Sequence, residues 1–272
     1  MATYIMGDLH GQVEAFNKML DKIKFNRDQD KLYLVGDYTD GWGSNSSELI
    51  LQLDNMRKHE CLFPVLGNHD DMMIHTIHKY EKCMREHGES DDSWVYDQMV
   101  MCWMNNMGMK SLEQYIKQSD RDKQIIKNFL ETLPLYEIVA VGEEQYYIAH
   151  AEVYMEAGPY RRRGKEYTIW GNPKNKLIDR LTTEIQEVLP GATLVTGHRI
   201  TTRYIDYPYN VDEPARIVKV PDKSRILIDC GCKGIQIKDN YSLGCLRLDD
   251  MKEFYITRDE LTNKINNILT YQ

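Results

Sequence analysis

The feature that most constrains the fold of this chain is a short apolar segment that ends in polar side chains, because it recurs five times. The first copy, YIMGDLHG, spans residues 4–11 and ends in Asp8 and His10. Side chains two positions apart point to the same side of an extended chain, so these two leave the strand together. A lone Asp-x-His sequence is equally typical of an ordinary strand end with a turn glycine. The repetition favours a functional site.

Four later segments have the same form. They are LYLVGDYTD with Asp37 and Asp40, FPVLGNHD with Asn68 and His69, YYIAHAE with His150, and TLVTGHR with His198. Ligands of α/β sheets collect at the carboxyl ends of strands, where backbone pairing stops. Carboxylate, imidazole and carboxamide groups together suit divalent ions such as Mn, Fe or Zn. The order predicts a metal site at one sheet edge, although His150 or His198 taken alone would be read as a core histidine.

Length and charge limit the other possibilities. The chain has 272 residues, enough for one large domain with its own core, and we expect residues 1–272 to form a single domain. The net charge of -8 disfavours stable nucleic-acid binding. No apolar run approaches the roughly 18 residues of a membrane span, so no membrane contact is expected. We expect a cytoplasmic protein, in a bacterium or a phage-infected host cell.

Apolar strands that alternate with helical periodicity predict an α/β (α+β) fold. Strands are expected over residues 31–35, 61–66, 135–141, 145–149 and 193–196. A helical block over about 71–133, with stretches at 70–87, 94–109 and 112–133, interrupts the strands, and we interpret it as a cap inserted beside the site. Residues 225–228, 242–248 and 253–256 are expected to close a second, antiparallel sheet, and further helices are expected near 176–188 and 260–269.

The segments GDLHG, GDYTD, GNHD, AHAE and TGHR, taken in order, resemble the phosphoprotein phosphatase branch of the calcineurin-like metallophosphoesterases. The bacteriophage lambda type looks most similar. The resemblance runs from residue 4 to about residue 257 and includes the WMNNMGMKSL and IDCGC segments. It implies a β-sandwich of two mixed sheets flanked by helices, and a two-metal phosphomonoesterase of the Ser/Thr protein phosphatase kind.

The resemblance also implies roles for individual residues. Asp8 and His10 would hold one metal ion, Asp37 would bridge both ions, and Asn68, His150 and His198 would hold the second. Mn is the expected metal, with Fe or Zn as alternatives. A hydroxide between the two ions would attack phosphorus in line. His69, oriented by Asp40, would act as the general acid on the leaving group. The alternative interpretation of His69 is a solvated loop histidine without a catalytic role.

The sequence departs from this family where arginines usually bind the substrate phosphate. Gly41 and, as we align it, Asn172 stand at those two positions. Three arginines are candidates to replace them: Arg162 in the run 161–163, Arg199 and Arg203. A run of arginines is also typical of a solvated surface.

The residues leave more than one function open. Our main expectation is a protein phosphatase that acts on a phosphorylated protein or a small phosphoester. The alternative is a diadenosine tetraphosphatase-like nucleotidyl polyphosphate hydrolase, because the GNHD spelling also resembles those enzymes. They commonly lack the acid-pair aspartate, so Asp40 favours monoester hydrolysis. Ile200 replaces the second histidine of the GHxH signature, which argues against a nuclease, and the intact ligand set argues against a non-enzymatic binding protein.

Overall fold

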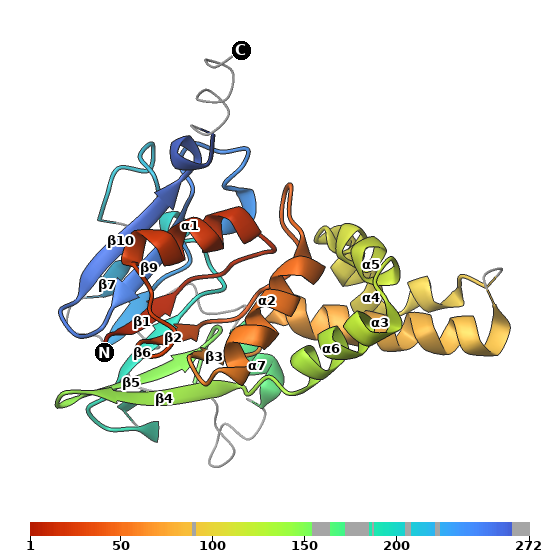
Figure 1. The fold of residues 1–272 in the computed structure, drawn as a ribbon, viewed down its shortest axis with the longest axis horizontal. Coiled ribbons are helices and arrows are strands. Elements are labelled where there is room, and N and C mark those ends of the chain that lie inside the picture. The colour runs from red at the N-terminus through yellow and green to blue at the C-terminus, as the bar shows by residue number, and fades with distance from the viewer. Residues whose placement is uncertain are drawn as a thin grey trace.

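The computed structural model describes residues 1–88, 91–153, 164–171, 185–186, 188–204, 208–220 and 224–262, and these residues build two mixed five-stranded sheets. The first sheet, in the order β10-β9-β1-β2-β3, comprises β1 (Thr3–Met6), β2 (Lys31–Leu34), β3 (Leu62–Pro64), β9 (Ser242–Arg247) and β10 (Lys252–Thr257). The second, in the order β4-β5-β6-β8-β7, comprises β4 (Tyr136–Val141), β5 (Glu144–Ala149), β6 (Thr193–Thr196), β7 (Val218–Val220) and β8 (Arg225–Leu227). The expected β-sandwich of two mixed sheets flanked by helices is confirmed (Figure 1).

The alternation of side chains along β1 shows how the two sheets form one core. Ile5 points to the second sheet and packs in a cluster that includes Ile148 and Val195. Its neighbours Tyr4 and Met6 point the other way, into the cluster under the helices. Both faces of this strand are therefore buried, which is why its sequence is an unbroken apolar run.

Helices cover the outer face of the first sheet. Helix α1 (Val13–Ile23) lies over β9 and β10, and α2 (Ser46–Lys58) lies beside β3 (Figure 1). In α1 the apolar residues recur at helical spacing, and Phe16, Met19 and Ile23 are buried against the sheet. Helix α7 (Lys165–Trp170) lies between β5 and β6 in the chain.

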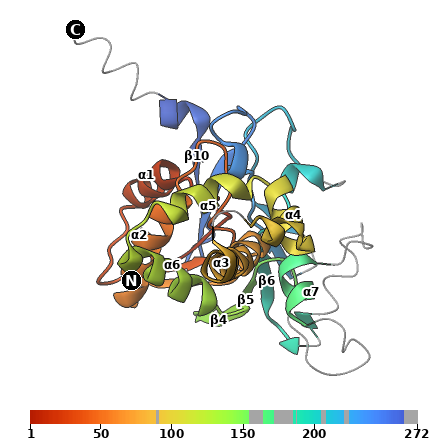
Figure 2. The same cartoon turned by 90° about the vertical axis from the view of Figure 1, so that its right-hand side faces the viewer.

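The expected cap is a block of helices inserted between β3 and β4. It contains α3 (Asn68–His87), the short 3-10 helix η1 (Ser93–Tyr96), α4 (Gln98–Asn105), α5 (Gly108–Ile116) and α6 (Asp120–Glu131). These helices extend away from the sandwich in Figure 1, and Figure 2 looks along α3 with the other cap helices around it. The stretch expected as one helix over 112–133 is two helices, because the Ser119 side chain caps the start of α6. The single-domain organisation stays a prediction.

Two expectations about the strands have different outcomes. The hairpin over 135–149 is confirmed, since β4 and β5 pair antiparallel. The second antiparallel sheet is wrong: β9 pairs with β1 and carries β10 into the first sheet, whereas β8 pairs parallel to β6. Every residue from Ser242 to Leu246 is buried, so β9 is a central strand of a sandwich and needs a partner on each side. Helices were also expected near 176–188 and 260–269, and most residues of both ranges lie outside the described part of the chain.

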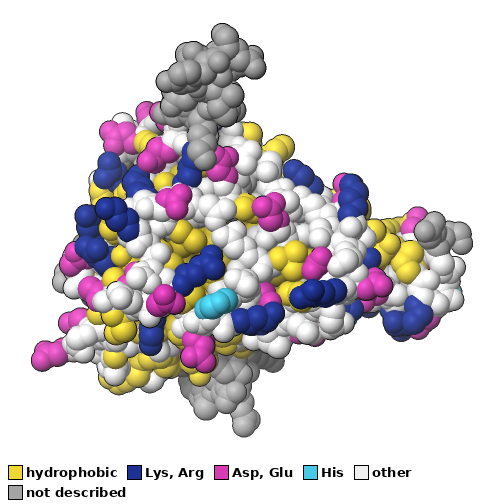
Figure 3. Space-filling model, viewed as in Figure 1, with side chains coloured by type: hydrophobic (Ala, Val, Ile, Leu, Met, Phe, Trp, Pro, Cys, Tyr) yellow, Lys and Arg dark blue, Asp and Glu magenta, His cyan; other side chains and the backbone are white. Residues whose placement is uncertain are grey.

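The described surface mixes charges of both signs. On the face shown in Figure 3, Lys and Arg side chains alternate with Asp and Glu across the sandwich and the cap. The described residues on this face therefore form no broad basic field for a phosphate backbone. Among the described residues, no helix is long and apolar enough to cross a membrane.

Candidate metal centre

The expected ligands come together because the strands that precede them are parallel neighbours. In the first sheet β1, β2 and β3 run side by side in one direction, and in the second sheet β5 and β6 do the same. Their carboxyl ends meet at one end of the sandwich. Three of the residues there have left-handed backbones, with φ values of 45° at His10, 55° at Asp37 and 67° at His198. Non-glycine residues seldom adopt this conformation, and such strain is concentrated at functional sites.

One half of the site surrounds His10. Its Nδ1 atom lies 2.6 Å from the carbonyl oxygen of Thr39, which fixes the proton on Nδ1 and leaves a lone pair on Nε2. That Nε2 atom lies 3.6 Å from Oδ2 of Asp37 and 4.0 Å from Oδ2 of Asp8. The imidazole lone pair and two carboxylates thus face a common point, an arrangement typical of a metal ligand whose tautomer is held by its other nitrogen.

The other half is built in the same way around His150. Its Nδ1 atom lies 2.8 Å from the carbonyl oxygen of Val35, so Nε2 again carries a lone pair. Nε2 lies 2.9 Å from Oδ1 of Asn68 and 3.4 Å from Oδ1 of Asp37, and Nδ1 of His198 lies 2.9 Å from the same Asn68 oxygen. The lone pair on Nε2 of His150 and the oxygens of Asn68 and Asp37 are acceptors that converge, so they need a proton or a cation between them. The donor set therefore fits two divalent ions, with the two oxygens of Asp37 directed to opposite halves.

Buried negative charge points to the same conclusion. Burial, and then the charge of Asp229, raises the pKa of Asp8 well above its ordinary value. Burial alone would lower the pKa of His150, but the neighbouring carboxylates of Asp37 and Asp8 outweigh it and raise that pKa to about 10. The site thus attracts positive charge, which is a proton on the chain alone and a metal ion when one is bound.

Next to these ligands lies the expected acid pair. Nδ1 of His69 is 2.8 Å from Oδ2 of Asp40, and both side chains are buried. The cap supplies two more partners for this carboxylate: Oγ of Ser111 donates to Oδ1 at 2.6 Å, and Nε1 of Trp103 donates to Oδ2. The imidazole of His69 also packs edge-on against that of His10, with ring centroids 5.0 Å apart. The cap therefore takes part in orienting the acid pair.

Two buried aspartates outside the expected set also shape the site. Asp70 accepts backbone N–H bonds from Asp37, Tyr38 and Gly67, and so joins the second and third ligand loops. Asp229 follows β8 and accepts the backbone N–H of Gly231 at 2.8 Å. Sequence reasoning missed Asp229, although it follows the apolar segment RILI in the same manner as the ligands.

The candidate phosphate-binding arginines have different outcomes. Arg162 and Asn172 lie outside the described residues. Arg199 directly follows the expected ligand His198. Burial raises the pKa of Asp229 to about 6, and the charge of Arg203 opposes that shift, so both arginines belong to the surroundings of the site. A role for any of the three in binding phosphate stays a prediction.

The structure explains the missing arginine at position 41. A Cβ atom on Gly41 would lie 2.2 Å from the carbonyl oxygen of His10 and 2.9 Å from Nε2 of Gln12. No real Cβ tolerates such a distance to backbone, so no side chain fits there. Lys233, in the 3-10 helix η4 (Cys232–Gly234), reaches the site from the neighbouring loop instead, and its Nζ atom lies 3.1 Å from Nε2 of His69. Sequence reasoning missed this lysine.

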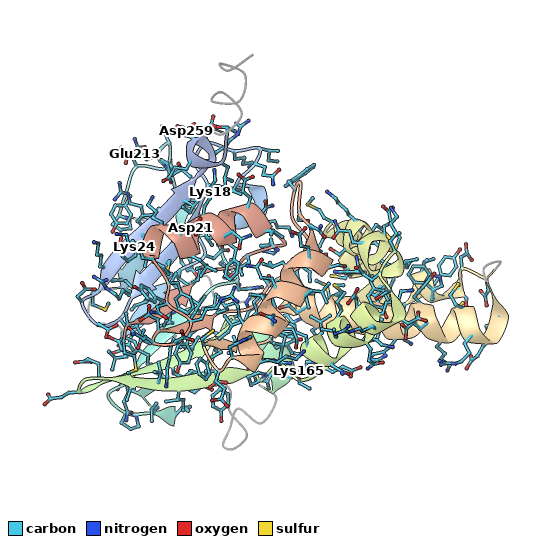
Figure 4. All side chains as sticks on the ribbon, in the orientation of Figure 1. Lys18, Asp21, Lys24, Lys165, Glu213 and Asp259 are labelled. Atoms are coloured by element: carbon cyan, nitrogen blue, oxygen red, sulfur yellow. The ribbon has the colours of Figure 1, made fainter. Side chains whose placement is uncertain are left out.

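A separate pocket of about 430 Å³ lies between α3, α6 and α7. Its rim includes an ion pair between Asp71 and Lys165, the lysine labelled in Figure 4. Its walls carry apolar side chains such as Leu66 and Ile74 together with His75. The volume is typical of a small-molecule pocket, but none of the six expected metal ligands is among its described lining residues.

Curated proteins of similar sequence include bacterial enzymes that share one name. A symmetrical bis(5'-nucleosyl)-tetraphosphatase of Pseudomonas syringae is 31% identical over 182 residues, 63% of this chain and 57% of that protein. A protein of the same name from Haemophilus ducreyi is 40% identical over 77 residues, 28% of this chain and 27% of its own length. The chain thus spans little more than half, or less, of the curated relatives that it matches.

Solved structures support the fold. A crystal structure described as a candidate diadenosine tetraphosphatase has a TM-score of 0.58 with 16% identity, covering 93% of this chain and 92% of that one. A protein serine/threonine phosphatase of Saccharomyces cerevisiae has a TM-score of 0.53 with 13% identity, covering 94% of this chain and 79% of that one. At such identities the likeness shows a shared architecture only.

These findings correct our main functional expectation. A Ser/Thr protein phosphatase with a phosphoprotein partner is contradicted, because the curated relatives, at 26–41% identity, are named as tetraphosphatases. The inference from Asp40 failed because an aspartate that orients a histidine serves any phosphoester cleavage and does not specify the leaving group. The location of the protein in the cell stays a prediction.

The coarser reading is confirmed. A sequence profile described as calcineurin-like phosphoesterase matches residues 1–228, which include all six expected metal ligands and the acid pair. That family implies a dinuclear metal centre, and the converging histidines and carboxylates described above fit one. The chain therefore belongs to the calcineurin-like phosphoesterase family.

Proposed function

We propose that this protein hydrolyses dinucleoside tetraphosphates symmetrically. Water adds to one of the two central phosphorus atoms, the central P–O–P bridge breaks, and two nucleoside diphosphates leave. The observation that carries the proposal is the shared name of the curated relatives, symmetrical bis(5'-nucleosyl)-tetraphosphatase. The buried set of metal-ligand atoms supports it. A polyphosphate anion needs concentrated positive charge, which bound metal ions would supply in a chain whose net charge is -8.

The six ligands would hold the two ions at the carboxyl ends of the strands. His10 and Asp8 belong to one half, Asn68 and His150 to the other, and Asp37 has one oxygen directed to each. When bound, a pair of divalent ions lowers the pKa of water and stabilises charge on the transferred phosphoryl group. We propose Mn as the metal, with Fe or Zn as alternatives.

The acid pair would serve the departing bridge oxygen. With Nδ1 of His69 hydrogen-bonded to Asp40, Nε2 is the nitrogen that would carry a proton to the leaving group once a substrate is bound. A nucleoside diphosphate is a weaker base than a serine alkoxide, so it needs less help from an acid. The proton of His69 therefore contributes less to cleavage of an anhydride than it would to cleavage of a phosphoserine ester.

The direct test is product analysis. Purified protein with added Mn is incubated with diadenosine tetraphosphate, and the nucleotides are separated by chromatography. Two molecules of ADP per substrate are expected. ATP with AMP would contradict symmetrical cleavage, and an intact dinucleotide would overturn the proposal. The Asp37→Asn variant, which should lose the activity, controls for contaminating hydrolases.

A further inference from the structure

Lys233 lies in a loop that contacts the loop where the family's arginine is missing. Its side chain is only partly exposed, and it leaves a loop that is otherwise closely packed: Cys232 and Gly234 are both buried. A lysine is seldom buried to this degree unless its charge has a partner. Lys233 Nζ has two contacts, Nε2 of His69 at 3.1 Å and the carbonyl oxygen of Asn106 at 3.5 Å.

The backbone brings this lysine to the place where the arginine is missing. The backbone N–H of Trp42 donates to the carbonyl oxygen of Lys233 at 3.0 Å, so the loop of Gly41 and the loop of Lys233 lie against each other. Because position 41 has no room for a side chain, the cation comes from the neighbouring loop that contains η4. The Asn106 contact ties the same ammonium group to the cap.

The contact with His69 shows which part of a substrate the lysine would meet. Nδ1 of His69 faces Asp40, so Nε2 is the atom that would meet the leaving group. The ammonium group of Lys233 lies at that same nitrogen. An oxygen placed beside Nε2 would therefore be within reach of both donors. For a serine or an alcohol this leaving group carries no further charge, whereas a nucleoside diphosphate carries a phosphate there.

We propose that Lys233 binds the phosphate of the departing nucleoside diphosphate and so makes the site selective for phosphoanhydride leaving groups. This inference rests on the proposed function and adds the residue that recognises the leaving group. Burial lowers the pKa of Lys233, and the carboxylates of Asp37, Asp40, Asp229 and Asp8 oppose that shift. Metal ions would offset the ligand carboxylates, which leaves the ammonium group available to an anion.

Three variants test the proposal. Lys233→Gln removes the charge, and Lys233→Arg keeps it. Lys238→Gln is the matched control, because Lys238 is exposed on the same segment and its side chain contacts Tyr241. Lys233→Gln is expected to lower kcat/KM for diadenosine tetraphosphate by about 10- to 100-fold, the usual effect of losing a hydrogen bond to a charged group. Lys233→Arg should recover a large part of the loss, and Lys238→Gln should match the wild type. Thermal melting of each variant checks that it is folded.

A binding measurement separates the leaving-group role from a general effect on the site. Calorimetry of the Mn-loaded protein gives the Kd for inorganic phosphate alone and for ADP in saturating inorganic phosphate, where the nucleotide must take the leaving-group position. We expect Lys233→Gln to raise the Kd for ADP by about 10-fold or more while the Kd for phosphate changes little. Equal weakening of both, or of neither, would overturn it. If the wild-type protein leaves the dinucleotide intact, the proposed function is wrong. The Kd for ADP would still decide the role of Lys233 in that case.

Discussion

The hydroxyl of Ser111 donates to Oδ1 of Asp40 at 2.6 Å, although the two residues belong to different parts of the fold. Ser111 lies on α5 of the cap, and Asp40 lies in the loop after β2 of the sandwich. Trp103 of α4 donates to the other oxygen of the same carboxylate. The inserted helices therefore hold the carboxylate that contacts His69, which links the cap directly to the acid pair.

Removal of this link should slow turnover without unfolding the protein. Ser111→Ala leaves Asp40 with the Trp103 and His69 contacts, so we expect kcat to fall by about 10-fold while KM changes little. Steady-state kinetics on diadenosine tetraphosphate measures this. Ser93→Ala, in an exposed position of the cap, is the control and should leave kcat unchanged. A melting temperature that falls in proportion to kcat would instead show a purely structural role.

The close contact at Gly41 predicts a strict size limit. Gly41→Ala would place a Cβ atom 2.2 Å from the carbonyl oxygen of His10, so the first and second ligand loops would have to move apart. We expect a loss of about 1–3 kcal/mol in the free energy of unfolding, the usual effect of overpacking, and a large loss of activity. Gly164→Ala is the matched control, since no atom of the described residues lies within 4 Å of the added Cβ there. Equal urea-unfolding midpoints for the two variants would contradict the prediction.

A buried ion pair supports the loop that carries His150. Glu152 and Arg225 are both buried, and the guanidinium of Arg225 donates to Glu152 at 3.2 Å and to the carbonyl oxygen of Ala151 at 2.9 Å. Glu152→Ala would leave a buried cation without this carboxylate. We expect a loss of about 3–5 kcal/mol in the free energy of unfolding.

Urea unfolding followed by circular dichroism measures that loss. Arg258→Ala is the control, because it breaks an exposed pair with Asp239, whose side chain is 84% accessible. Exposed pairs contribute only about 0–1 kcal/mol. A Glu152→Ala variant as stable as Arg258→Ala would show that the buried pair contributes little.

Metal analysis tests the assignment of the six ligands. The wild-type protein is expected to bind about two Mn ions and to melt at a higher temperature with Mn than after treatment with a chelator, because the ions bind the folded state only. His150→Ala removes a ligand from one half, so the metal content should fall toward one ion. Asp37→Asn weakens both halves and should reduce the content further. Full metal content in both variants would refute the assignment.

Local sequence was sufficient to identify the loops that carry the expected ligands. Apolar runs that stop at Asp8, Asp37, Asn68, His150 and His198 mark strand ends whichever strand lies beside them, because burial of both faces requires a continuous apolar segment. The helical cap was predictable for a similar reason, since helical spacing is also a local property. The order of these segments indicated the family but not its substrate.

Only the tertiary structure decided the contacts that join distant segments. Three sets of contacts connect residues at least 63 positions apart. They are the pairing of β9 with β1, the contact of Lys233 with His69, and the hydrogen bonds from Trp103 and Ser111 to Asp40. Nothing in the local pattern of the lysine or the tryptophan specifies such a partner. The pairing depends on how loops and helices pack once the sandwich has formed, since a side chain's neighbours across the fold are set by packing and not by its own sequence environment.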